Sequence, residues 1–82
     1  MKYYIVKPTN NKIDENIING IKELDKNMEI VYILEDCDIV VLQKGWTRSK
    51  NACDERNRAY FELKKPCREA HIYLTYETIH LN

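Results

Sequence analysis

The apolar positions are densest at residues 39–42, where Ile, Val, Val and Leu follow one another. Three of these four residues are β-branched, and such a run is typical of a short strand buried on both faces. A polar loop follows over residues 43–50. A helix is then expected from 51 to about 65, ahead of Pro66, which cannot continue it. Strand, loop and helix form half of a βαβ unit, in which ligands sit beyond the carboxyl ends of the strands.

The N-terminal part predicts a second strand and an amphipathic helix. Residues 2–6 are aromatic and β-branched, which favours a strand. A turn follows, and Asn10 or Asn11 is expected to cap a helix over about 12–26. The apolar residues of that helix fall on one stripe: Ile13, Ile17, Ile18, Ile21 and Leu24.

Residues 28–37 fit two structures. As a strand, this segment would form a hairpin with residues 39–42. As a helix, its apolar residues Ile30, Ile33, Leu34 and Cys37 would share one face. The pattern alone leaves both open.

The C-terminal part predicts a strand over 71–75, and residues 78–81 form either a short edge strand or a packed segment. Eighty-two residues make one domain, residues 1–82. The expected fold class is α/β, a small three-layer flavodoxin- or Rossmann-like parallel sheet of three or four strands with flanking helices.

Charge separates the chain into two parts. The net charge is zero, so neither a nucleic-acid polymer nor a membrane is an expected partner. Residues 44–68, however, hold eight Lys or Arg against three Asp or Glu, and the remainder is net −5. The positive segment suits a phosphate-bearing ligand, and the alternative is a solvated helix face of mixed charge.

Cysteine usage favours a reducing cytoplasm. Cys37, Cys53 and Cys67 are odd in number and lack C-x-x-C spacing, which argues against a disulfide framework. A zinc site with His71 or His80 would match no standard spacing, so neither a metal nor another cofactor is expected. No apolar run approaches the roughly 20 residues that span a bilayer.

A spaced motif covers the central segment: Asp38, Val40, Leu42, Gly45, Trp46, Ser49, Ala52, Glu55 and Ala59. This pattern resembles the nucleoside 2-deoxyribosyltransferase-like family, and is closest to a compact branch often found in phage genomes. Residues 4–8, YIVKP, resemble the opening strand of that family, Y-I-A-G-P. The resemblance favours a helix for residues 28–37 and implies that the family's second strand is missing. It also implies a homodimer or larger homo-oligomer in a bacterial or phage-infected cytoplasm.

The resemblance implies roles for single residues. Glu55 matches the nucleophile that attacks the anomeric carbon of the sugar, and Tyr4 matches a tyrosine that touches both nucleophile and sugar. Ser49, with the backbone N–H groups of residues 51–53, would hold a phosphate at a helix N-terminus. The residues expected to bind ligand are Lys7, Trp46, Arg48, Ser49, Asn51 and Ala52, with Lys50 adding charge.

Each of these residues also has a structural interpretation. Ser49 fits a helix N-cap, Glu55 a first-turn helix stabiliser, and Tyr4 a core residue. Trp46 fits simple packing in the loop. The cations fit solvated surface.

Three departures from the family pattern bear on activity. Lys7 and Asn51 replace glycines, and Ile30 stands where relatives carry an acid, with Glu29 beside it. Loss of a general acid typically costs 10²–10⁴-fold in rate. The sequence therefore predicts a protein that binds a nucleotide, either a nucleoside phosphate or an ADP-ribose-like ligand, with weak or no turnover. One alternative is a nucleotide N-glycosidase or deoxyribosyltransferase that uses Glu55, and another is an interaction module that has lost the site.

Overall fold

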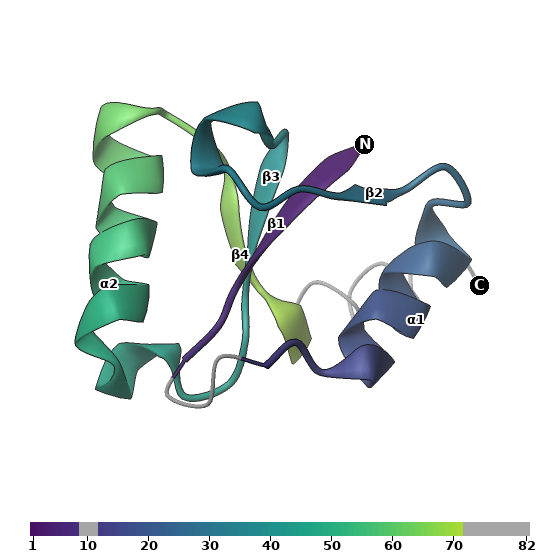
Figure 1. Cartoon of the computed structure of the whole chain (residues 1–82), viewed down its shortest axis with the longest axis horizontal. Coiled ribbons are helices and arrows are strands. Elements are labelled where there is room, and N and C mark those ends of the chain that lie inside the picture. The colour runs from purple at the N-terminus through teal and green to yellow at the C-terminus, as the bar shows by residue number, and fades with distance from the viewer. Residues whose placement is uncertain (9–11, 72–82) are drawn as a thin grey trace.

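The computed structural model describes residues 1–8 and 12–71 and contains one parallel sheet. Its strands are β1 (Lys2–Val6), β2 (Glu29–Ile30), β3 (Ile39–Leu42) and β4 (Cys67–Glu69). They lie in the order β2-β1-β3-β4, with every neighbouring pair parallel (Figure 1). The predicted α/β class with a parallel sheet is confirmed.

The pairing of β1 with β3 forms the centre of the sheet. It runs from Tyr3 opposite Ile39 to Val6 opposite Leu42. Because successive side chains of a strand point to opposite faces, each strand supplies both sides of the sheet. Val6, Val40 and Leu42 pack in one apolar cluster, and the other face carries a second cluster: Tyr3, Ile5, Ile39 and Val41. The prediction that residues 39–42 are buried on both faces is confirmed.

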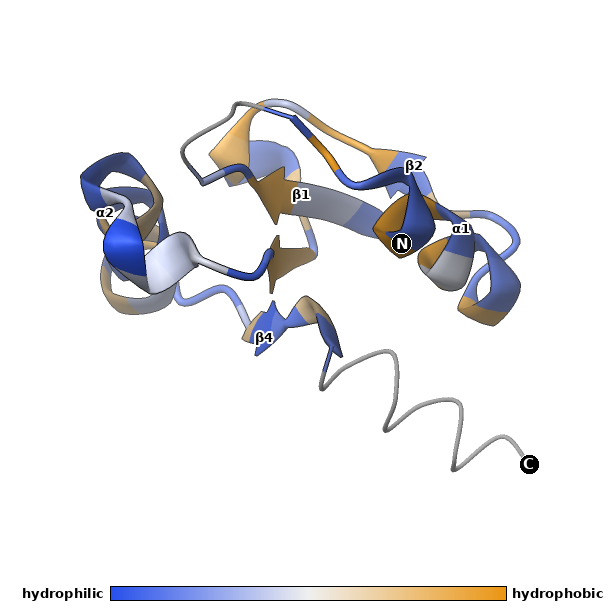
Figure 2. Cartoon of the chain, turned by 90° about the horizontal axis from the view of Figure 1, so that it is seen from below, coloured by the Kyte–Doolittle hydropathy of each residue, from blue (hydrophilic) through white to orange (hydrophobic). Residues whose placement is uncertain are grey.

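One helix covers each face. Helix α1 (Glu15–Leu24) places Ile21 in the second cluster, with Ile17 and Ile18 packed beside it. Helix α2 (Lys50–Asn57) lies on the other face, where Ala52 is fully buried. Figure 1 shows the sheet between these helices, and in Figure 2 the apolar ends of the central strands lie between them. The result is the expected three-layer arrangement.

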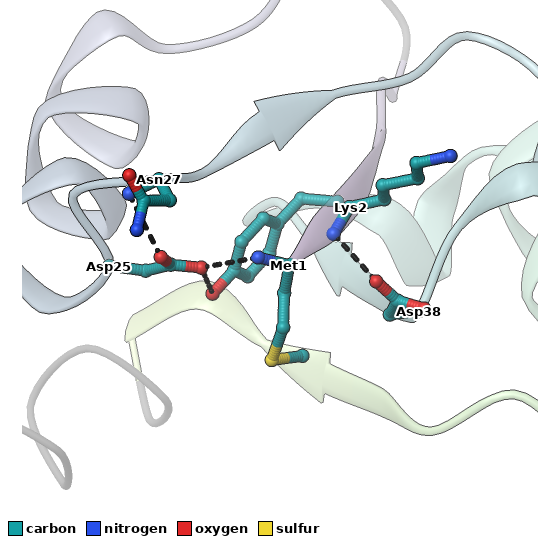
Figure 3. Close-up of polar contacts among 6 residues, drawn as sticks. Met1, Lys2, Asp25, Asn27 and Asp38 are labelled. Atoms are coloured by element: carbon teal, nitrogen blue, oxygen red, sulfur yellow. Dashed lines mark hydrogen bonds and ion pairs between the residues drawn. The ribbon is translucent and has the colours of Figure 1, made fainter.

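The start of β1 is held by two aspartates (Figure 3). The Asp25 carboxylate accepts from the amino group of Met1 at 2.8 Å, the Tyr3 hydroxyl at 3.2 Å and the Asn27 N–H at 3.1 Å. The ammonium group lowers the pKa of Asp25. Asp38 accepts from the Lys2 N–H at 2.8 Å, which links the start of β1 to the start of β3.

Gln43 joins three segments at the opposite end of the sheet. It follows β3 directly and is almost fully buried. Its amide nitrogen donates to the carbonyls of Val6 and Lys12 at 3.1 and 3.0 Å, and its oxygen accepts from the Asp14 N–H at 2.9 Å. These bonds satisfy buried backbone groups that would otherwise be costly to bury. They attach the start of α1 to the carboxyl ends of β1 and β3.

Helix α1 begins later than the sequence predicts. Its N-cap is Asp14, whose side chain accepts from the Asn16 N–H at 2.9 Å, so Asn10 and Asn11 are not the cap. The predicted start near residue 12 was therefore wrong. The apolar stripe is confirmed at Ile17, Ile18 and Ile21, which pack against the sheet, whereas Ile13 packs there from a position before the helix.

Residues 28–37 form neither the favoured helix nor the alternative hairpin. Instead β2 pairs in parallel with the start of β1, and a 3₁₀ turn, η1 (Leu34–Asp36), follows. The N–H of Val31 donates to the Tyr3 carbonyl, while Leu34 and Cys37 are buried against the sheet. Pairing with the edge of β1 therefore determines the structure of this segment, although the spacing of its apolar residues also fits a helix. The short β2 also contradicts the expectation that a second strand is missing.

The second helical segment falls close to its predicted place, whereas the last strand does not. Ser49 caps α2, and the helix continues as a π-turn, η3 (Arg58–Glu62). Strand β4 follows Pro66 directly and ends before residue 71, and His71, the one described residue of the predicted 71–75 strand, is helical, so that prediction was wrong there. Residues 72–75 and 78–81 lie outside the described residues. Within residues 1–8 and 12–71, no helix is long and apolar enough to cross a membrane.

We expect Gln43→Leu to lower the free energy of unfolding by about 2 kcal/mol or more, because it leaves two carbonyls and one N–H without their partner. Urea denaturation measures this change. Lys44→Leu, at the exposed neighbouring position, is the control. Equal stability of the two variants would show that Gln43 does not hold these segments together.

Candidate functional site

The carboxyl ends of β1 and β3 lead into the two segments that form the site. Val6 and Leu42 are paired, so Lys7 and the loop after Gln43 start from the same edge of the sheet. Gly45 has φ of 91°, a conformation that glycine adopts without strain. The chain then forms a 3₁₀ turn, η2 (Trp46–Arg48), and reaches Ser49 at the start of α2. This is the end of a parallel sheet at which ligands commonly bind.

Tyr4 and Glu55 are in direct contact. The Tyr4 hydroxyl on β1 donates a hydrogen bond to the Glu55 carboxylate on α2. Burial, together with the hydrogen bond to Glu55 and its negative charge, raises the pKa of Tyr4 well above its ordinary value. Tyr4 is therefore a neutral donor at physiological pH and fixes the position of the carboxylate.

A polar hollow of about 380 Å³ opens beside this pair. Three cations, Lys7, Arg48 and Lys50, border it, and Glu55 is its only acid among the described residues. The full lining is Lys7, Pro8, Arg48, Ser49, Lys50, Asn51 and Glu55. The structure thus brings together five of the eight predicted site residues here, with Tyr4 joined to them through Glu55.

Ser49 acts as the N-cap, as one interpretation of the sequence predicts. Its hydroxyl oxygen accepts from the Ala52 N–H at 3.3 Å, and its carbonyl accepts from the Cys53 N–H at 2.9 Å. Two of the three backbone N–H groups expected to meet a phosphate are therefore already bonded. Charge in the hollow comes mainly from side chains.

The two remaining predicted residues lie elsewhere. The Ala52 side chain is fully buried in the core. It packs α2 against the sheet and does not reach the hollow. The Trp46 indole donates to Glu69 on β4 at 3.1 Å and lines a different, smaller hollow of about 110 Å³. Trp46 is thus near β4.

A second hollow, of about 390 Å³, lies on the other side of Glu55. Tyr4, Leu34 and Arg58 contribute to its wall. The Arg58 guanidinium forms an ion pair with Glu35 and a longer one with Glu62 at 3.8 Å. Glu55 therefore stands between a cationic hollow and a second, mixed one.

The acid missing at position 30 is not replaced by its neighbour. Glu29 pairs with Lys2 at the amino end of β1, whereas the cationic hollow lies beyond the carboxyl end of the same strand. Within this chain, Glu29 cannot serve Glu55. The expectation that it might recover the acid's role is therefore wrong for a single copy.

Sequence reasoning missed the residues that shape the site indirectly. Gln43 follows an apolar strand as the first polar residue, and nothing in the pattern marks it as buried. Arg58 and Glu35 are ordinary surface residues in the sequence, and only the parallel β2 brings their segments together. The acceptor for Trp46, Glu69, follows from the position of β4.

The three cysteines are free thiols. Burial raises the pKa of both Cys37 and Cys67, so these two are poorly reactive. Among the described residues, no group of three or more His, Cys, Asp or Glu is arranged to hold a metal ion.

Comparisons with protein-family models, with curated proteins and with solved structures give no match to this chain. The similarity to nucleoside 2-deoxyribosyltransferase-like proteins stays a prediction from the motif residues.

The Tyr4–Glu55 contact predicts an alkaline pH dependence. The pKa of Tyr4 is higher in the folded chain than the unfolded value of about 10, so its contribution to folding is complete below pH 10 and is lost as the pH rises further. Stability of the wild type should therefore fall more steeply above pH 10 than that of Tyr4→Phe. Urea denaturation at several alkaline pH values measures the difference, and parallel curves for the two proteins would contradict the contact.

Proposed function

We propose that the chain binds a nucleotide, with its phosphate in the cationic hollow and its sugar next to Glu55. The observation that carries this proposal is the convergence of Lys7, Arg48 and Lys50 on one hollow that also reaches the Tyr4–Glu55 pair.

The charge distribution supports a phosphate over a neutral ligand. Three cations border a small polar hollow, and hydrogen bonds from cations to phosphate oxygens are stronger than those between neutral groups. Ser49 and Asn51 add a hydroxyl and an amide, which suit phosphate or sugar oxygens. A nucleoside phosphate and an ADP-ribose-like ligand share this chemistry.

The position of Glu55 supports a sugar over a second phosphate at the inner end of the hollow. A carboxylate repels phosphate, whereas it accepts hydrogen bonds from sugar hydroxyls. Tyr4 holds one carboxylate oxygen and leaves the other for a ligand. A nucleotide that extends from the cations past Glu55 would point its base toward the second hollow.

The acids near Glu55 are poorly placed to protonate a leaving nucleobase, which supports weak or absent turnover. Departure of a nucleobase needs a proton from a nearby acid. Glu29 is at the wrong end of β1, and Glu35 is engaged by Arg58. Asp54, the other acid on the second hollow, is exposed to solvent. The neutral Tyr4 hydroxyl already donates its hydrogen bond to Glu55. These features favour binding over catalysis.

The second candidate is an N-glycosidase or deoxyribosyltransferase with Glu55 as nucleophile. The Tyr4–Glu55 bond favours it, because a positioned carboxylate next to a sugar is what a covalent glycosyl intermediate requires. In that reaction a carboxylate oxygen bonds to the anomeric carbon while the bond to the base breaks. The expected homodimer or larger assembly, which would be the source of a missing acid, stays a prediction.

Binding should depend on the phosphate and on the cations. We expect 2′-deoxynucleoside 5′-monophosphates to bind more tightly than the corresponding nucleosides, and Arg48→Ala with Lys50→Ala to weaken their binding about tenfold or more. Calorimetry at several salt concentrations measures both, and the variant should be less sensitive to salt. Lys22→Ala, an exposed cation on α1, is the control. Equal affinity for nucleoside and nucleotide would count against the cationic hollow.

Turnover separates the two candidates. Free-base release from deoxynucleotides is measured for the wild type, for Glu55→Gln and for Glu62→Gln, an exposed glutamate at the end of the same helical segment. We expect no release or slow release from the wild type, and none from Glu55→Gln. Nucleotide binding should survive in Glu55→Gln, because a negative charge near the phosphate is removed. Release that persists without Glu55 would rule out its role as nucleophile.

A further inference from the structure

A cluster of aromatic rings surrounds one arginine on the side of α2 nearest β4. The Arg56 guanidinium lies 4.7 Å from the ring centroid of Tyr60, 5.7 Å from that of Phe61 and 5.8 Å from that of Trp46. The rings of Tyr60 and Phe61 meet edge to face with centroids 5.0 Å apart. We call these four residues the aromatic–arginine patch. It is separate from the cationic hollow, which none of them lines.

The π-turn explains how two adjacent rings reach the same arginine. In an α-helix, residues four apart share a face, so Tyr60 but not Phe61 would lie over Arg56. The π-turn η3 has i to i+5 spacing, seen in the bond from the Leu63 N–H to the Arg58 carbonyl. This spacing brings Phe61 to Arg56 as well. Such turns are rare and concentrate at functional sites.

The patch is open to solvent and its charge is not compensated. Tyr60 is 49% exposed and Phe61 58% exposed, which is unusual for such large rings. Among the described residues, Arg56 forms no ion pair with a carboxylate, and its one hydrogen bond goes to the Asn57 side-chain oxygen.

The surrounding segment is strongly positive. Residues 56–68 contain five Lys or Arg and one acid, Glu62. Arg58 and Lys65 are engaged inside the fold, by Glu35 and by the carbonyls of Glu35 and Cys37. Arg56 and Lys64 remain to meet an outside partner, and Lys64 is exposed. The zero net charge of the whole chain hides this local excess.

We propose that the aromatic–arginine patch binds single-stranded nucleic acid. Exposed rings next to cations suit a single strand. Its bases stack on aromatic faces, and its phosphates contact Lys and Arg. Tyr60 and Phe61 supply the stacking surfaces, and Arg56 and Lys64 supply the charge. This inference goes beyond nucleotide binding in the cationic hollow and does not depend on it.

The charge of the patch argues against a second copy of the chain as its occupant. In a symmetric dimer the same patch meets itself. That arrangement would bring Arg56 of one copy against Arg56 of the other, with Glu62 and the Trp46-bonded Glu69 as the carboxylates beside them. A polyanion neutralises the same charges. The observations therefore favour nucleic acid over self-association.

Fluorescence anisotropy with a labelled oligothymidylate of about 12 nucleotides tests the proposal. At low salt we expect the single strand to bind and affinity to fall as salt rises. Phe61→Ala and Tyr60→Ala should each weaken binding about fivefold or more, since each removes a stacking surface. Tyr60→Phe keeps the ring and should bind like the wild type. Arg56→Gln should reduce the dependence on salt.

The control is Lys22→Ala, which removes an exposed cation on α1, on the opposite face of the sheet from the patch. It should leave oligothymidylate binding unchanged. Circular dichroism confirms that each variant is folded. The proposal is overturned if the wild type does not bind at low salt, or if Phe61→Ala and Lys22→Ala bind equally well. A homodimer that Phe61→Ala dissociates would assign the patch to a second copy and overturn it too.

Discussion

The parallel pairing of β1 with β3 is the constraint on which the rest of the structure depends. It buries apolar side chains on both faces and so requires a helix on each side. It also aligns the carboxyl ends of the two strands, which brings Lys7 to the loop that ends at Ser49. Gln43 fastens this edge by bonding backbone groups at Val6, Lys12 and Asp14. The cationic hollow is a consequence of that alignment.

Some side chains of the site stabilise the fold, and others supply the charge for the proposed ligand. Ser49 is engaged as a helix cap, and Ala52 closes the core. Tyr4 joins β1 to α2 through Glu55, so the residue that would face a sugar also connects two layers of the fold. The side chains of Lys7, Arg48 and Lys50 carry no such structural bond among the described contacts, and they supply the charge that a phosphate needs. Binding can therefore be weakened through these cations without loss of the fold.

Periodicity was sufficient for the two central strands, the stripe on α1 and the cap at Ser49, because each depends on local sequence and on burial that the pattern reports. It failed at residues 28–37, where pairing with β1 overrode a helical spacing. It also misplaced the start of α1, since Asp14 offered a cap that Gln43 holds in place. The motif predicted the meeting of Tyr4 with Glu55. The buried Gln43, the Trp46–Glu69 contact and the aromatic–arginine patch depend on tertiary structure and on a π-turn that no sequence pattern marked.

We propose that the cationic hollow at the end of β1 takes the phosphate of a nucleotide. The most direct test of this proposal is a titration of the ¹⁵N-labelled protein with a 2′-deoxynucleoside 5′-monophosphate, followed by the chemical shifts of the backbone amides. The account predicts that the largest changes fall at Lys7 and at residues 48–51, with smaller ones at Glu55 and few on α1. Changes confined to α1 or to the aromatic–arginine patch, or none at high ligand concentration, would contradict it.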